Sequence, residues 1–315
     1  MRIFLYEYAC ARPADAGLPP SIRREGRAMH AALRADFTRL AGVEVLALAA
    51  PADEQPAFAA LARAADWSLI IAPEFDDLLL TRCRWVEAAG GRLLGPSSDA
   101  VRWTGDKWAT FQLLTQHGVP TPRTWLADGQ RDHLSPLVAK PRFGAGSLEM
   151  GVLTASAAQA FARPGFLVQE FVPGTAASVA VLVGPAGTVA LAPAAQRLSG
   201  DGRFRYLGGT LPLPGPLAER AAALARRAVA AVPGLRGYVG VDLVLGEADD
   251  GRGDMVIEIN PRVTTSYIGL RALAAGNLAA AMLQVVRGEP VGPLRWRRGR
   301  VTFTAGGLVR RTAAT

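Results

Sequence analysis

Apolar runs alternate with amphipathic stretches over about the first 100 residues of the chain. Short apolar runs rich in Ile, Leu and Val predict buried strands, and the stretches between them carry apolar residues at helical spacing. The predicted order is strand 2–9, helix 21–40, strand 43–50, helix 54–65, strand 67–74, helix 78–89 and strand 92–97. Strict alternation of this kind is typical of a doubly wound α/β unit.

The rhythm changes after Pro96. The expected elements are a helix at 104–118, an extended segment at 119–125, a strand leading into a glycine-rich loop at 136–151, a strand at 166–174, a hairpin around 184–187, a helix at 216–232 and two paired strands at 237–246 and 254–262. Proline and glycine mark most of these boundaries. Hairpin strands mixed with helices predict an α+β architecture for the rest of the chain.

Composition places the chain among globular proteins. It has 315 residues, of which 50% are hydrophobic and 20% charged, enough for two or three domains with a sizeable core. Two cysteines are too few for a disulfide framework and fit a reducing compartment. Glu7 interrupts the first apolar run, and no stretch of 18 apolar residues follows. We therefore expect a cytoplasmic protein without a membrane partner.

The charge balance adds one alternative. The net charge is +8, but the arginines are dispersed, and only RWRRGR at 295–300 forms a local run. An excess of this kind suits small anionic substrates. A nucleic-acid-binding role would instead use 295–303, with arginines on phosphates and Trp296 on a base. We expect no nucleic-acid partner, because that role would leave the polar residues described next without a task.

Three oxygen-bearing side chains fall on the two paired strands near the end of the chain. Glu258 and Asn260 are two residues apart, so they share one face of a strand, and a hairpin would bring Asp242 alongside them. Two carboxylates and an amide carbonyl form a ligand set that Mg²⁺ accepts, with phosphate oxygens and water completing the coordination. The alternative is an edge strand that shows these side chains to water.

Two lysines supply candidate phosphate partners. Lys107 and Lys140 stand at the ends of predicted elements, in a chain that otherwise uses arginine for positive charge. Lys140 precedes the loop RFGAGSLEMG, whose glycines could bring backbone N–H groups onto phosphates. The loop lacks the spacing of a P-loop or of a dinucleotide fingerprint. A flexible surface turn is therefore the alternative interpretation of the loop.

A series of motifs, rather than any one of them, resembles the ATP-grasp superfamily. In chain order they are DK (106 and 107), GVPTP (118–122), AKPRFGAGS (139–147), VQEFVPG (168–174), VGVDLV (239–244) and IEINPR (257–262). The resemblance covers about residues 95–290, and the preceding α/β unit looks like the domain that ATP-grasp enzymes carry in front. It implies a pre-ATP-grasp domain at 1–98, a lid subdomain at 99–172 and a C-terminal subdomain with the metal site at 173–315.

The resemblance also implies roles for individual residues. ATP would lie between the two subdomains, with one or two Mg²⁺ ions, or Mn²⁺ in their place. The implied nucleotide contacts are Lys107, Lys140, Gly144, Gly146 and Ser147 at the phosphates and Gln169, Glu170 and Val172 at the adenine. Asp242, Glu258 and Asn260 would hold metal, while Arg262 and Lys140 would act on the reacting groups. Ala176 and Gly240 depart from the family's pattern, which leaves the ribose contacts and the oxyanion arrangement open.

Most superfamily members join a carboxylate to an amine through an acyl phosphate, a reaction that needs positioning and charge stabilisation but no protein nucleophile. This explains why no Ser-His-Asp or Cys-His set stands out. A kinase or carboxylase would use the same ATP site with another acceptor.

A narrower resemblance points to the tyramine–L-glutamate ligase branch, which serves methanofuran-type cofactor biosynthesis. It rests on YEYACA, LPPSIRREGRAM, IAPEFDDLL and EINPRVTTSYIGLR. It implies glutamate as the acid and tyramine or tyrosine as the amine. The implied substrate contacts are Glu7, Arg24, Glu25, Glu74, Thr264, Thr265 and Ser266. Turn formation, a solvated helix face and helix capping are the alternatives for these residues. The amine, the number of glutamates added and the oligomeric state, a homodimer included, stay open.

Overall fold

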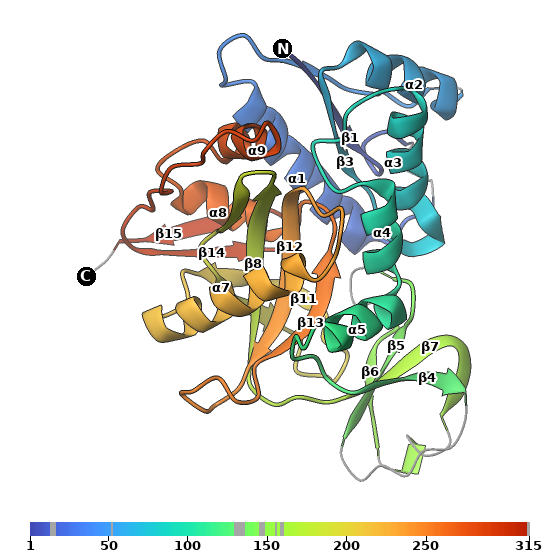
Figure 1. The fold of residues 1–315 in the computed structure, drawn as a ribbon, viewed down its shortest axis with the longest axis vertical. Helices are drawn as coiled ribbons and strands as arrows, with labels where there is room; N and C mark the ends of the chain where they lie inside the picture. Colours follow the sequence, from blue (N-terminus) through green and yellow to red (C-terminus); the bar gives the residue numbers. More distant parts are fainter. Residues whose placement is uncertain are drawn as a thin grey trace.

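A computed structural model describes residues 1–12, 17–51, 53–128, 136–144, 149–154, 156–157 and 161–313. These residues form three β-sheets with helices packed around them (Figure 1). The first sheet lies near the N-terminus, a four-stranded sheet follows it in the chain, and an eight-stranded sheet takes up most of the remainder.

The first sheet is parallel and covered on both faces, as the alternating pattern predicts. Its strands are β1 (Arg2–Glu7), β2 (Glu44–Leu46) and β3 (Trp67–Ile71), in the order β2-β1-β3. Its helices are α1 (Pro20–Phe37), α2 (Glu54–Ala64) and α3 (Leu78–Ala88). Ile3 and Leu5 belong to the core on the α1 side, whereas Phe4 and Tyr6 belong to the core with α2 and α3. The doubly wound prediction is therefore confirmed.

Two local predictions around residue 100 were wrong. The segment 92–97 forms only an isolated bridge between Ser68 and Leu93, not a fourth strand. The single helix expected at 104–118 is two helices, α4 (Ser98–Gly105) and α5 (Lys107–Gln116). Asp106 breaks the helix, because its backbone is extended and its carboxylate accepts hydrogen bonds from the N–H groups of the next turn, as an N-cap does. The break makes Lys107 the first residue of α5.

The four-stranded sheet is antiparallel and has a small core of its own. Its strands are β4 (Thr124–Asp128), β5 (Leu137–Pro141), β6 (Gly151–Leu153) and β7 (Ala162–Glu170), in the order β4-β7-β5-β6. Figure 1 shows it at the lower right, apart from the other two sheets, with α5 beside it. Residues of this sheet and of the eight-stranded sheet line a common cavity.

The eight-stranded sheet contains the predicted strand pair and several elements that we did not predict. The expected strands are β8 (Thr175–Gly184) and β9 (Gly187–Ala190), which form the hairpin, and the neighbours β12 (Gly237–Leu245) and β13 (Met255–Asn260). The additional strands are β10 (Ala194–Leu198), β11 (Tyr206–Leu211), β14 (Arg300–Thr304) and β15 (Val309–Thr312). The main path of the sheet runs β13-β12-β8-β10-β11-β14-β15.

Helices cover both faces of this sheet. The helix α7 (Gly215–Ala230) packs on β8 and β12 on one face, and α8 (Ser266–Leu273) and α9 (Leu278–Val286) lie on the other. No described helix is long and apolar enough to cross a membrane. Trp296, the candidate base-stacking residue, is half-buried and packs against the core beneath α8 and α9.

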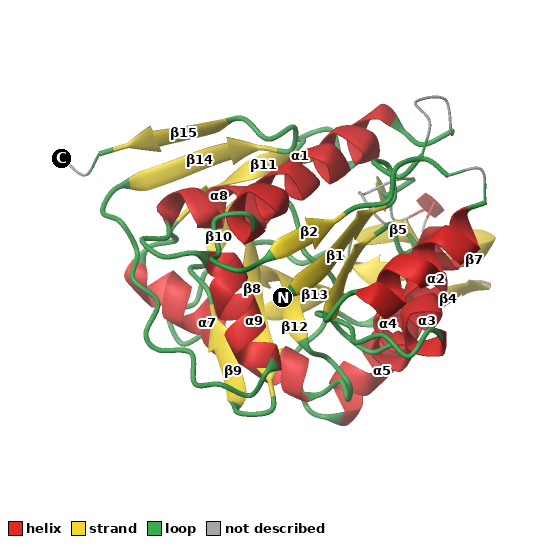
Figure 2. Cartoon of the chain, turned by 90° about the horizontal axis from the view of Figure 1, so that it is seen from above, coloured by secondary structure: helices red, strands yellow, loops and turns green. Residues whose placement is uncertain are grey.

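The first sheet and the eight-stranded sheet meet in one continuous core, which we call the shared core. It joins Ile3 and Phe37 to Tyr267 and Met282, and α1 runs along α8 and α9 (Figure 2). Asp36 anchors this contact. It accepts hydrogen bonds from Tyr267 Oη at 2.7 Å and from Arg271 Nε and Nη2 at 2.8 and 2.7 Å. The domain boundaries at 98 and 172 stay predictions, but the packing across the first is extensive.

Candidate active site

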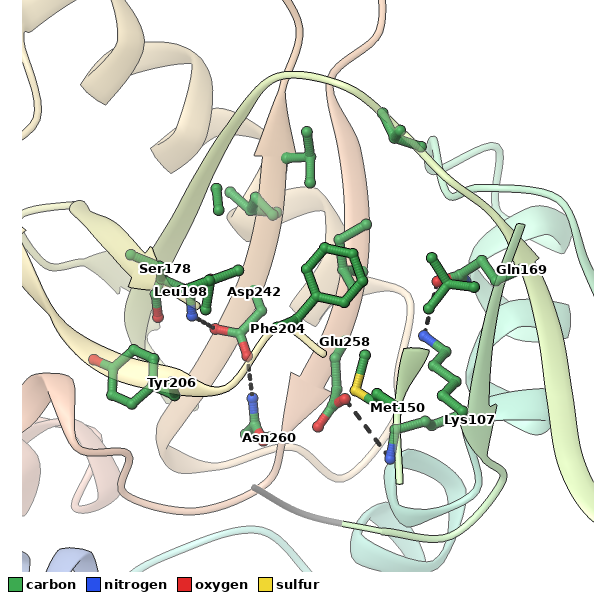
Figure 3. A pocket seen from close by; sticks show the side chains of 18 of the residues that line it. Lys107, Met150, Gln169, Ser178, Leu198, Phe204, Tyr206, Asp242, Glu258 and Asn260 are labelled. Carbon is green, nitrogen blue, oxygen red and sulfur yellow. Dashed lines mark hydrogen bonds and ion pairs between the residues drawn. The ribbon is translucent and has the colours of Figure 1, made fainter. Parts of the chain in front are cut away.

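A cavity of about 410 Å³ opens between the four-stranded and eight-stranded sheets, and it collects most of the residues that the sequence singled out. The predicted residues that line it are Glu25, Lys107, Lys140, Gly144, Gln169, Glu170, Val172, Asp242, Glu258, Asn260, Arg262, Thr264, Thr265 and Ser266. Gly146 and Ser147 lie outside the described residues. Figure 3 shows part of the cavity lining, with Asp242 beside Asn260 and with Glu258 between Asp242 and Lys107.

The acidic residues come from the neighbouring strands β12 and β13. Asp242 lies directly opposite Glu258 in the antiparallel register, and Asn260 follows two residues later on the same face. Asn260 Nδ2 donates a hydrogen bond to Asp242 Oδ2 at 3.1 Å, and Gln196 Nε2 donates to Asp242 Oδ1 at 2.9 Å (Figure 3). The expected convergence of these three side chains is therefore present.

The electrostatics of this group favour a cation. Burial, and then the negative charge of Glu258, raise the pKa of Asp242 to about 7. Two carboxylates held side by side in a low-polarity site repel each other, and a divalent ion would remove that cost. Within the described residues no cluster of three or more His, Cys, Asp or Glu side chains could hold a metal. An ion here would take Asn260, water or phosphate oxygens as further ligands, which fits Mg²⁺ or Mn²⁺.

The two lysines reach the cavity from the other side. Lys107 Nζ donates a hydrogen bond to the carbonyl of Gly144 at 2.7 Å and lies 3.6 Å from Glu258 Oε2. Lys140, on β5, is 2% exposed, and its Nζ donates to Gln169 Oε1 at 2.8 Å. Burial lowers the pKa of Lys140 to about 8 although the carboxylates nearby oppose the change. Both ammonium groups thus face the carboxylates, a placement that suits phosphate oxygens between them.

The outer part of the cavity is apolar and lies beside the segment that joins β7 to β8. Phe171, in that segment, stacks on Phe204 with ring centroids 6.2 Å apart. Other apolar lining residues are Val138, Met150, Ala176, Leu198, Leu243, Val244 and Ile257. An apolar slot beside exposed backbone suits a flat heteroaromatic ring, which needs stacking surface and a few hydrogen bonds at its edge.

Arg262 follows β13 and connects the cavity to the first sheet. Its Nε and Nη2 donate to the two carboxylate oxygens of Glu74 at 2.7 and 3.0 Å, and its Nη1 donates to the carbonyl of Val263 at 3.3 Å. Among the described residues, these contacts leave one N–H group on each terminal nitrogen for a ligand. Glu74 does not line the cavity itself. It holds the arginine that does.

Thr264 and Ser266, two further predicted residues, form a group with Tyr238. Thr264 Oγ1 and Ser266 Oγ lie 3.2 and 3.0 Å from Tyr238 Oη, at the end of the cavity beyond Asn260. Gly240 makes room for this group, because a Cβ there would stand 2.4 Å from Thr264 Cγ2.

Two N-terminal residues do not contribute as expected. Glu7 is 3% exposed, its Oε2 accepts the N–H of Cys10 at 2.7 Å, and the backbone of Gly26 closes over its other oxygen. Arg24 is exposed on α1 and does not line the cavity. Both expectations came from the family resemblance, and neither side chain lines the cavity.

Among the described residues, four polar lining residues were missed. Ser178 lies on β8 opposite Asp242, Gln196 and Tyr206 come from β10 and β11, and Ser199 follows β10. Burial, followed by the charges of Asp242 and Glu25, raises the pKa of Tyr206 well above its ordinary value, so its hydroxyl stays protonated. Gln196 could not be found without β10 itself, and the short stretch AAQRL carries little strand signal.

The sequence of this chain matches two known protein families. The sequence pattern of the ATP-grasp domain matches residues 104–266, and that of the pre ATP-grasp 3 domain matches residues 28–101. The chain belongs to the ATP-grasp family. The first match contains the lysines and the strand pair of the cavity, and the ATP-grasp fold with its preceding α/β domain is confirmed.

Individual proteins that are similar to this chain have more specific names. Two proteins named tyramine–L-glutamate ligase, from Methanocaldococcus jannaschii and Methanocaldococcus fervens, are 29% and 30% identical to this chain over 206 residues. Each alignment covers 65% of this chain but only 58% and 62% of those proteins. A crystal structure of an ATP-grasp superfamily protein from Archaeoglobus fulgidus superimposes with a TM-score of 0.75 and 26% identity, covering 96% of this chain and 92% of that one.

Proposed function

We propose that this ATP-grasp protein is an ADP-forming carboxylate–amine ligase that makes an amide through an acyl phosphate. The observation that carries the proposal is the opposition of charges across one cavity. Asp242 and Glu258 line it together with Lys107, Lys140 and Arg262, and Lys107 Nζ lies 3.6 Å from Glu258 Oε2. This arrangement can bind a nucleoside triphosphate with its phosphates between the lysines and the acids, and a carboxylic acid beside the arginine.

The chain's own residues supply positioning and charge. Lys107 and Lys140 would hold phosphate oxygens, and Asp242, Glu258 and Asn260 would hold one or two divalent ions, which neutralise charge on the phosphates when bound. Arg262, oriented by Glu74, would direct its free N–H groups at the substrate carboxylate. That carboxylate attacks the γ-phosphorus to give an acyl phosphate and ADP. The amine nitrogen then attacks the acyl carbon, the bond to the phosphate oxygen breaks, and an amide and inorganic phosphate result.

L-glutamate and tyramine, or tyrosine in its place, are the proposed substrates. The names of the two similar proteins support this pair. The polar end of the cavity, with Thr264, Thr265 and Ser266 beside Glu25, offers hydrogen-bonding groups for a small amino acid or amine. Such an enzyme would serve methanofuran-type cofactor biosynthesis in the cytoplasm.

The direct test is the dependence of ADP release on both substrates. We expect ADP and phosphate in equal amounts only when ATP, Mg²⁺, L-glutamate and tyramine are all present, with the glutamyl amide detected by mass spectrometry. ADP release that needs bicarbonate, or a phosphorylated acceptor as the stable product, would assign the same site to a carboxylase or a kinase instead.

Isotope transfer tests the intermediate. Glutamate labelled with ¹⁸O in its carboxylates should pass one labelled oxygen to inorganic phosphate when tyramine is added, because the attacking carboxylate oxygen leaves with the phosphoryl group. An adenylate route would place the label in AMP and release pyrophosphate, and it would contradict the proposed chemistry.

A further inference from the structure

The far end of the cavity contains a carboxylate with an unused oxygen. Glu25, on α1, lines the cavity, and its Oε2 accepts a hydrogen bond from Thr265 Oγ1 at 2.9 Å. Among the described residues no hydrogen bond or ion pair reaches its Oε1. Thr265 is 5% exposed and belongs to the segment between β13 and α8, so the fixed oxygen is held from the eight-stranded sheet while the other stays available.

The other predicted acids of this part of the chain, Glu74 and Glu7, do not line the cavity. Glu74 gives both of its oxygens to Arg262. Glu7 is closed off behind Gly26 and cannot meet a ligand. Among the described residues of the first sheet's part of the chain, Glu25 is therefore the acid that lines the cavity, and Arg262, whose positive charge acts on it, is already paired with Glu74.

The charge balance at this end leaves Glu25 without full compensation. Burial raises the pKa of Glu25, although the hydrogen bond from Thr265 and the positive charges of Arg262 and Arg24 act in the opposite direction. Tyr206, which shares this end, stays neutral and adds no charge. An uncompensated carboxylate in a partly dry pocket is stabilised most by a small cation that donates hydrogen bonds.

We infer that Glu25, clamped by Thr265, is the binding subsite for a primary ammonium group carried by a substrate of this cavity. The inference rests on the proposed function, since it assigns the ammonium group to a substrate that shares the cavity with the phosphates that the lysines would hold. A ligase of glutamate and tyramine has two such groups, the α-ammonium of the acid and the ammonium of the amine. A carboxylate that binds either one distinguishes ammonium substrates from neutral analogues of the same size.

The test compares Glu25→Gln with the wild-type enzyme on matched substrates. Gln keeps the shape and the hydrogen bond to Thr265 but removes the charge. In the acid arm, L-glutamate is compared with glutarate, which lacks the α-ammonium, with hydroxylamine as a neutral nucleophile. In the amine arm, tyramine is compared with hydroxylamine at saturating glutamate. Glu219→Gln, on the exposed face of α7, is the control for the same chemical change elsewhere.

We expect Glu25→Gln to raise KM at least about tenfold for one ammonium substrate, while its reactions with glutarate and hydroxylamine remain within about twofold of wild type. A rise confined to tyramine assigns the subsite to the amine, and a rise confined to glutamate assigns it to the acid. Unchanged KM values for both ammonium substrates, or an equal loss with the neutral analogues, would overturn the inference.

Calorimetric binding separates this inference from the proposed reaction. Tyramine and L-glutamate are titrated into wild-type and Glu25→Gln protein with ADP and Mg²⁺ present, so that no turnover is needed. We expect one of the two ligands to bind wild type and to lose at least about tenfold in affinity in the variant. If neither binds wild-type protein at millimolar concentration, or if binding is equal in the variant, the subsite does not exist, whatever the outcome of the activity assays.

Discussion

Arg262 and Glu74 form a two-point ion pair across 188 residues of the chain, with N–O distances of 2.7 and 3.0 Å. The pair joins Arg262, which follows β13 in the ATP-grasp domain, to Glu74, which lies in the loop after β3 in the preceding domain. Both side chains are buried, at 14% and 5% exposure. The orientation of the guanidinium in the cavity therefore depends on a residue that lies outside the cavity lining.

We expect Arg262→Lys to lower kcat by roughly 100-fold with little change in the KM for ATP. Lysine keeps the positive charge but cannot donate to Glu74 and to the substrate in the fixed planar geometry of a guanidinium. Steady-state kinetics with both substrates measure the effect. A full-rate Arg262→Lys enzyme would remove Arg262 from the reaction.

Glu74→Gln should give a smaller loss of kcat of the same kind. Gln can accept one of the two hydrogen bonds but leaves the buried arginine without its counter-charge. If Glu74→Gln changed only thermal stability and left kcat untouched, Glu74 would have a purely structural role.

Asp242 and Glu258 should be needed for turnover and should lower the stability of the metal-free protein. Asp242→Asn and Glu258→Gln are each expected to reduce turnover by at least about 100-fold, because each removes a proposed ligand and a negative charge from the proposed metal site. Without metal, in EDTA, we expect the melting temperature of Asp242→Asn to equal or exceed that of wild type, because the variant removes repulsion between two partly buried carboxylates. A marked loss of stability in EDTA would show that Asp242 supports the fold instead.

The lowered pKa of Lys140 predicts that kcat/KM for ATP decreases at alkaline pH. Its pKa is lowered to about 8 by burial, so the protonated form, which the proposed phosphate contact needs, dominates below that pH and is lost above it. The kcat/KM for ATP should therefore fall as the pH rises through about 8, since this ratio reports the free enzyme. In Lys140→Arg, whose guanidinium stays charged at all accessible pH values, this decrease should disappear even if the overall rate is lower.

The contacts of Asp36 should stabilise the fold although this residue does not line the cavity. Asp36→Asn removes the charge that holds Arg271 and Tyr267, and we expect a loss of about 2 kcal/mol in the free energy of unfolding, as for hydrogen bonds to charged groups. Urea denaturation measures it. The control is Asp250→Asn, which removes an exposed pair with Arg252 and should cost well under 1 kcal/mol. Equal losses in both variants would contradict the anchoring role.

Much of the fold could be predicted because its signals are local. Alternating apolar runs identified the first sheet, and the spacing of Glu258 and Asn260 placed two polar side chains on one face of a strand. The helix break at Asp106 was missed although its sequence signal, an Asp two to three residues before free N–H groups, was present. The helical periodicity on both sides of the break concealed it.

The rest depended on long-range contacts. Gln196 hydrogen-bonds Asp242 because β10 pairs with β8, and nothing in the local sequence specifies that pairing. The pairing of Arg262 with Glu74 likewise depends on how two domains pack. Glu7, which the family resemblance implied as a substrate contact, is instead buried against Gly26 of α1, a contact that no local pattern specifies.

The shared core limits how this protein could be recombined with its relatives. The inner face of α1 carries Leu33, Phe37 and Asp36 against α8 and α9, and the same helix presents Glu25 to the cavity. A chimera that took residues 1–98 from this chain and the remainder from another ATP-grasp protein would therefore mismatch side chains within a packed core. Exchange of substrate preference should succeed only when α1 is transplanted together with α8, and the four-stranded sheet, with its separate core, is the part of the molecule that a foreign sequence could replace most readily.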